Sequence, residues 1–107
     1  MHWLEKLSPQ ATMVPSLRDR SEHDGLPALH IGLNLGPVVR RDGDYYGSVV
    51  NVAARVAAQA GPGEIIVTAS LREAMEDEDE PRFEEIGPTR LRNVARPLRL
   101  FRVVREA

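Results

Sequence analysis

Polar and apolar residues alternate most clearly in the stretch LHIGLNLG, within residues 28–39. Leucine or isoleucine occupies every second position, at Leu29, Ile31, Leu33 and Leu35. This period of two predicts a β-strand with one buried face. The intervening Gly32 and Gly36 leave the other face without bulk, so we expect another part of the chain to approach the backbone closely there.

A second apolar pattern has helical spacing and begins at Val49. Its side chains recur every three or four residues in one stripe: Val49, Val52, Ala53, Val56, Ala57 and Ala60. The stripe predicts an amphipathic helix over 49–60, with Ser48 as its N-cap and Gly61-Pro62 as its end. Residues 38 and 39 either continue the preceding strand or pair in a hairpin, and RRDG at 40–43 predicts a turn.

The remainder of the chain predicts short elements. EIIVT at 64–68 predicts a buried strand, and Ser70 with Glu73 match a capping box for a short helix. The dipeptide Gly87-Pro88 predicts a break between strands. The strands expected in this region lie at 83–86, 91–94 and 98–104. This order of strands and helices is an α+β arrangement with an antiparallel component.

The N-terminal residues give a weaker pattern. Trp3, Leu4 and Leu7 share one helical face, and residues 16–23 predict a short helix. We therefore divide the chain into a poorly defined segment, 1–27, and a folded unit, 28–107.

Composition and charge narrow the class of protein. A length of 107 residues with 42% hydrophobic content suits one soluble domain. The net charge of −2 gives no overall basic field for nucleic acid, and the only aromatics in the arginine-rich C-terminal strands, Phe83 and Phe101, are too few for base stacking. No segment reaches the ~20 apolar residues of a membrane span, so we expect a cytoplasmic protein. Cysteine is absent. The three histidines match no zinc spacing and are expected to be structural or incidental: His2, His23 and His30.

Three polar residues around the start of the predicted helix suggest chemistry. Asn51 and Arg55 are four positions apart, so they lie on the same helix face, about 40° apart. Together they offer a neutral and a charged donor to an anion. Asp44, in the turn just before the helix, offers an acceptor. An acceptor at one end and phosphate donors at the other would suit a nucleotide.

The spacing of these residues resembles that of the class III nucleotidyl cyclases, the adenylyl and guanylyl cyclases. The motif is Asp44-x-x-Gly47-x-x-x-Asn51-x-x-x-Arg55, preceded by Ile31-Gly32 and Gly36-x-Val38. GPGEIIVTASLRE and FEEIGPTRLRNVARPLRLFRV are similar to later parts of the same domain. The resemblance covers about 29–104 and implies a partial ferredoxin-like α+β domain, mostly antiparallel, with helices on one face. Residues 28–107 would then be the C-terminal part of a cyclase catalytic domain.

The resemblance assigns a role to each polar residue. Asp44 would accept from the adenine amino group, and Asn51 would orient the ribose of the substrate. Arg55 would stabilise charge on the α-phosphate as the 3′ hydroxyl attacks. A carboxylate would meet the guanine carbonyl acceptor to acceptor, so Asp44 favours adenine. The implied reaction converts ATP to cyclic AMP and pyrophosphate.

The family's two Mg or Mn ions are held by aspartates of the first half of the domain, and we find no matching motif for them or for the base-reading lysine. In the family the site forms between two cyclase domains, one bearing the metal and the other the three residues above. We therefore expect the chain to be inactive without a metal-bearing partner, and to associate either as a homo-oligomer or with a second cyclase domain. Uncovered sheet edges in a partial domain also favour association. The alternative is a non-catalytic dimerisation or nucleotide-sensing module.

Overall fold

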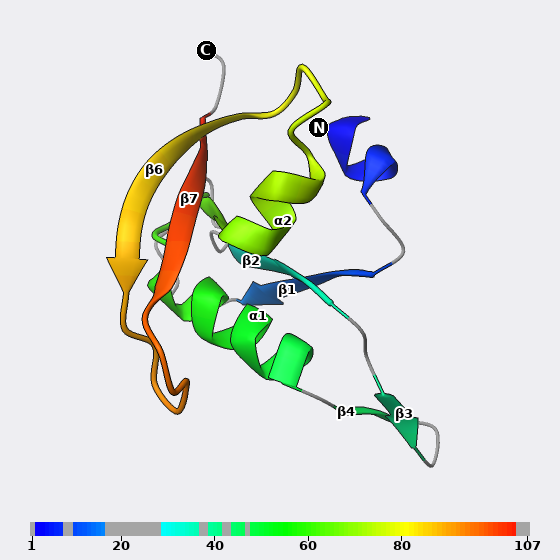
Figure 1. Cartoon of the computed structure of the whole chain (residues 1–107), viewed down its shortest axis with the longest axis vertical. Coiled ribbons are helices and arrows are strands. Elements are labelled where there is room, and N and C mark those ends of the chain that lie inside the picture. The colour runs from blue at the N-terminus through cyan, green and yellow to red at the C-terminus, as the bar shows by residue number, and fades with distance from the viewer. Residues whose placement is uncertain are drawn as a thin grey trace, which may run out of the picture.

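The strands form a five-stranded sheet and a separate two-stranded hairpin (Figure 1). The computed structural model describes residues 2–7, 10–16, 29–36, 39–41, 44–46 and 48–104. Its elements in chain order are the 3-10 helix η1 (His2–Lys6), β1 (Ala11–Ser16), β2 (His30–Leu35), β3 (Val39–Arg41), β4 (Asp44–Tyr46), α1 (Ser48–Gln59), β5 (Ile65–Thr68), α2 (Ala69–Ala74), β6 (Arg82–Thr89) and β7 (Leu98–Val104).

The sheet has the strand order β1-β2-β5-β7-β6. β2 and β5 are parallel neighbours joined through α1, and the other neighbouring pairs are antiparallel. The expected α+β class with a mostly antiparallel sheet is therefore confirmed. β3 and β4 form the hairpin, with Val39 opposite Tyr46 and Arg41 opposite Asp44. Of the two alternatives for residue 39, the hairpin is the one observed.

β2 lies inside the sheet and is buried on both faces. Leu33 packs into one core, whereas His30, Gly32 and Asn34 face α1 on the other side. A Cβ atom on Gly32 would collide with the α1 backbone, so the close approach expected at this glycine is confirmed. The expectation of a half-buried strand is wrong, because the polar positions contact a helix instead of water.

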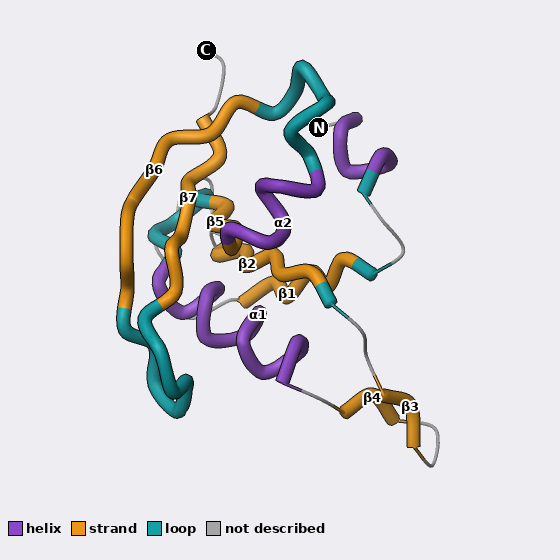
Figure 2. The backbone as a smooth tube through the Cα atoms, viewed as in Figure 1, coloured by secondary structure: helices purple, strands orange, loops and turns teal. Residues whose placement is uncertain are grey.

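The two α-helices pack on opposite faces of the sheet (Figures 1 and 2). Val56 of α1 packs with Ile66 of β5 in the core on the α1 face. Leu71 of α2 packs with Val67 of β5 in the core on the other face. Ile66 and Val67 point to different cores because successive side chains of a strand alternate. The placement of α2 therefore differs from the expectation that the helices share one face.

Two details after α2 differ from the sequence patterns. Residues 91–94 do not form a strand: they lie in the loop between β6 and β7, where Asn93 has a φ of 63° and buried Leu91 packs into the α1-side core. Gly87-Pro88 does not break the chain into two strands either. β6 continues through it with a shift in register, because a bulge absorbs one residue without ending the pairing.

The N-terminal residues contribute to the same sheet and core. Trp3 of η1 is buried against the α2-side core, and β1 pairs with β2 along its whole length. Residues 17–28 lie outside the described residues, and so does most of the helix expected at 16–23. The division of the chain at residue 28 stays a prediction. Among the described helices, none is long and apolar enough to cross a membrane.

Candidate functional site

Asn51 and Arg55 lie one turn apart on the same side of α1, because the helix runs through both positions without interruption. Asn51 is exposed and Arg55 is half-buried, whereas Ala53 and Val56 beside them are fully buried. The buried stripe fixes the rotation of the helix about its axis. The helix therefore presents an amide and a guanidinium at the surface, a pair of donors that suits an anionic ligand.

Asp44 is the first residue of β4, in the hairpin that leads into α1. The hairpin lies beyond the N-terminal end of α1, away from the five-stranded sheet (Figure 1). Asp44 is paired with Arg41 across the hairpin in the backbone register. Its side chain lies outside what the structure describes, so its convergence with Asn51 and Arg55 stays a prediction.

Sequence reasoning missed a buried polar cluster beneath the first turn of α1. Asn34, at the end of β2, donates from Nδ2 to the Val49 carbonyl oxygen at 3.2 Å. Its Oδ1 accepts from the Thr68 hydroxyl at 2.7 Å and from the Ser70 hydroxyl at 3.3 Å. Asn34 and Thr68 are 7% and 4% exposed, so the cluster is almost dry. An asparagine between leucines was the signal in the sequence for a buried polar contact.

The same cluster explains why the expected capping box is absent. Ser70 lies inside α2 instead of before it, and Thr68 occupies the N-cap position without a side-chain capping bond. Thr68 has a single hydroxyl hydrogen, which it donates to Asn34. Ser70 also has a single hydroxyl hydrogen, which lies between two acceptors, Asn34 Oδ1 at 3.3 Å and the Thr68 oxygen at 3.0 Å.

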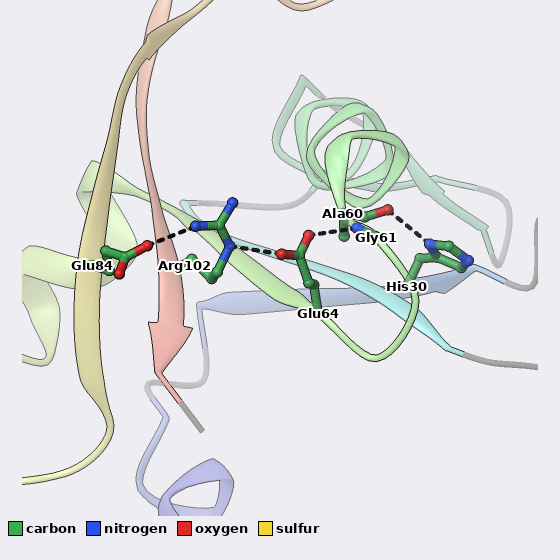
Figure 3. Close-up of polar contacts among 6 residues, drawn as sticks. All are labelled: His30, Ala60, Gly61, Glu64, Glu84 and Arg102. Atoms are coloured by element: carbon green, nitrogen blue, oxygen red, sulfur yellow. Dashed lines mark hydrogen bonds and ion pairs between the residues drawn. The ribbon is translucent and has the colours of Figure 1, made fainter. Parts of the chain in front are cut away.

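A second set of polar contacts holds the other end of α1 (Figure 3). His30 is 1% exposed, and its Nδ1 lies 2.7 Å from the Ala60 carbonyl oxygen. Because a carbonyl can only accept, Nδ1 carries the donated hydrogen. This contact gives His30 a structural role at the end of the helix. His23 lies outside the described residues, as does the side chain of His2.

Glu64 extends these contacts across the sheet to β6. Its carboxylate accepts from the Gly61 amide at 2.6 Å and from Arg102 Nε at 2.7 Å, and Arg102 also donates to Glu84 at 2.7 Å. The hydrogen bond from Gly61, with the charge of Arg102, lowers the pKa of the Glu64 carboxyl below its ordinary value. The nearby Glu64 charge in turn raises the pKa of Arg102.

The described residues do not fit a resident metal ion. No group of three or more histidine, cysteine or acidic side chains is close enough to hold one in this part of the chain. Magnesium needs several oxygen ligands in near-octahedral geometry.

Comparison with known proteins agrees with the fold. The family model of the adenylate and guanylate cyclase catalytic domain matches residues 10–102. The pH-sensitive adenylate cyclase MT1302 of Mycobacterium tuberculosis is 44% identical over 87 residues, covering 78% of this chain and 22% of the relative. Putative adenylate cyclase 3 of Rhizobium meliloti is 33% identical over 92 residues, covering 86% of this chain and 16% of the relative.

A solved structure shows the same fold. The adenylate/guanylate cyclase/hydrolase from Silicibacter pomeroyi superposes with a TM-score of 0.69 at 33% identity, covering 81% of this chain and 52% of that one. The α+β fold and the match to the family model define a nucleotidyl cyclase type of domain. The chain belongs to the adenylate and guanylate cyclase catalytic domain family. It spans about a fifth of the length of the two curated relatives.

Proposed function

We propose that the chain supplies the base-recognition and transition-state half of an adenylyl cyclase site. The observation that carries this proposal is the shared, solvent-facing side of α1 that bears Asn51 and Arg55 one turn apart, in a member of the cyclase family. Both curated relatives described above are named adenylate cyclases, which supports ATP as the substrate. Because ATP is the substrate, we also propose a cytoplasmic site of action.

In the proposed reaction, the 3′ oxygen of ATP bonds to the α-phosphorus and the bond to the pyrophosphate oxygen breaks. The 3′ hydroxyl loses its proton, and cyclic AMP and pyrophosphate leave. Arg55 would donate to the α-phosphate oxygens as negative charge builds there, because a fixed guanidinium stabilises such charge strongly. Asn51 would hold the ribose, and Asp44 would accept from the adenine amino group.

A second cyclase domain would complete the site. The proposal assigns to that domain the carboxylates for Mg or Mn, since the described residues of this chain hold no group of ligands for them. The chain alone would then be inactive, and it would associate with that domain or with another copy of itself. Size-exclusion chromatography with light scattering tests association, and a monomer at every concentration and in every mixture would contradict it.

The proposed function is tested by measuring cyclic AMP formed from ATP with Mn, by the chain alone and mixed with a metal-bearing cyclase domain. The asparagine and arginine of that domain are disabled beforehand, so product can form only at a shared site. Activity in the mixture alone is the expected result. Gln59→Ala, an exposed change on the same helix as Asn51, is a control that retains activity, whereas Asn51→Ala loses it.

If the chain is folded and soluble but the mixture forms no cyclic AMP, the result would count against the proposal. The non-catalytic dimerisation or nucleotide-sensing module would then be favoured. Regulation of a partner that survives both Asn51→Ala and Arg55→Ala would support that module directly.

A further inference from the structure

β2 runs beneath α1 and contacts it at three levels. His30 bonds to the Ala60 carbonyl just beyond the end of the helix, Gly32 meets the backbone at its middle, and Asn34 bonds to Val49 in its first turn. The helix is thus held at both ends by a buried polar side chain from one strand. The two ends differ in what lies next to them, because Asn51 and Arg55 follow Val49 within two turns.

The amide of Asn34 has only one orientation that satisfies its neighbours. The Val49 carbonyl oxygen can only accept, so the Asn34 nitrogen must face it, and the amide oxygen then faces the hydroxyls of Thr68 and Ser70. Val49 also packs tightly on β2's end, since a Cβ atom on Gly36 would lie 2.7 Å from its Cγ2. The first turn of α1 is therefore fixed to the ends of the two parallel strands, β2 and β5.

We infer that Asn34 is a positioning residue that sets where Asn51 and Arg55 stand relative to the substrate. The inference rests on the proposed function of that pair. An apolar side chain at position 34 would fill the same space, but it would allow α1 to occupy several slightly shifted positions. A buried polar network with every group satisfied specifies one arrangement. A misplacement of about 1 Å from a change far from the chemistry can cost about a hundredfold in rate.

The test compares Asn34→Asp with His30→Phe in the mixed cyclic AMP assay. Asn34→Asp keeps the size and the acceptor but replaces the donor to Val49 by an oxygen, so two acceptors face each other. His30→Phe is the matched control: it removes another buried donor, the one that contacts the other end of the same helix. Asn34→Asp is expected to lower kcat per folded molecule by about tenfold to a hundredfold, with a smaller change in KM. His30→Phe is expected to stay within about twofold.

Hydrogen exchange of the α1 amides gives a second readout that does not depend on activity. Asn34→Asp is expected to speed exchange in the second turn, at residues 52–55, and His30→Phe at the C-terminal end. If Asn34→Asp does not fold, Thr68→Val removes the hydroxyl donor to Asn34 more gently and takes its place in both measurements. If the wild-type mixture is inactive, the proposed function fails and exchange alone decides whether Asn34 fixes the first turn.

Two results would overturn the inference. One is equal loss of kcat per folded molecule in Asn34→Asp and His30→Phe, since Asn34 would then have no particular effect at the end of the helix that bears Asn51 and Arg55. The other is unchanged exchange at residues 52–55 in the Asn34 and Thr68 variants.

Discussion

Gly32 of β2 and Ala57 of α1 bring two backbones into direct contact. A Cβ atom at position 32 would collide with the Ala57 amide nitrogen and the Ala53 carbonyl oxygen, neither of which can move without moving the helix. Gly32→Ala is therefore expected to lower the free energy of unfolding by about 3 kcal/mol, at the upper end of what overpacking costs. Urea unfolding followed by circular dichroism measures the change.

Ala54→Leu is the control for Gly32→Ala. It adds a larger group to the same helix, but on its exposed side, where solvent makes room. A change within about 0.5 kcal/mol is expected, because leucine is also a good helix former. A Gly32→Ala variant as stable as this control would show that the helix can lift from the strand without cost.

The lowered pKa of Glu64 predicts a pH-dependent contribution to stability. A carboxyl whose pKa is lower in the folded protein stabilises it above the unfolded pKa, here 4.5, and loses that effect as the pH falls through the folded value. Glu64→Gln keeps an acceptor for Gly61 but removes the charge. At neutral pH it should be less stable than wild type by about 1 kcal/mol. Below the folded pKa the difference should shrink.

Unfolding curves at neutral pH and at a series of decreasing acidic pH values measure this difference. Glu85→Gln is the control, because its 3.0 Å pair with Arg99 joins side chains that are about half exposed. An exposed pair contributes little, so a change of about 0.5 kcal/mol or less is expected. A constant Glu64→Gln effect across the pH range would assign it to packing instead of charge.

Local patterns were sufficient to predict the elements that position the site. The apolar stripe of α1 and the buried run of β5 each follow from side-chain periodicity, and the structure confirms both. The i, i+4 spacing alone placed Asn51 and Arg55 on one face. These features depend on neighbours within a few residues, which a single sequence shows.

Features that depend on distant contacts could not be predicted in the same way. The alternating pattern predicted that Asn34 lies on the solvent-exposed face of a strand. In the structure it forms hydrogen bonds with Val49, Thr68 and Ser70, which belong to three other elements. Leu91 looked like part of a strand, yet it fills the core from a loop. In both cases the side chain contacts residues that are distant in the sequence. The local pattern of polar and apolar residues does not identify those residues.

Arg55 is predicted to act on the transition state more than on binding. Arg55→Ala should lower kcat in the mixed assay by about a hundredfold to a thousandfold, with KM for ATP less affected. Arg55→Lys should not restore the rate, because an ammonium cannot match the forked donors of a guanidinium. Arg96→Ala removes an exposed arginine from the loop before β7 and should leave kcat unchanged. If Arg55→Ala and Arg96→Ala lowered kcat equally, the loss would be due to the change in net charge and not to a specific role of Arg55.

Asp44 is predicted to set the choice between ATP and GTP. Its carboxylate can accept from the adenine amino group but would repel the guanine carbonyl. Asp44→Asn keeps the size and offers a donor, so it should reduce the preference for ATP by about tenfold or more. The measurement is kcat/KM for both nucleotides in the mixed assay, with Gln59→Ala as a variant that retains the wild-type ratio. If Asp44→Asn lowers activity with both nucleotides equally, the residue holds the hairpin in place and does not read the base.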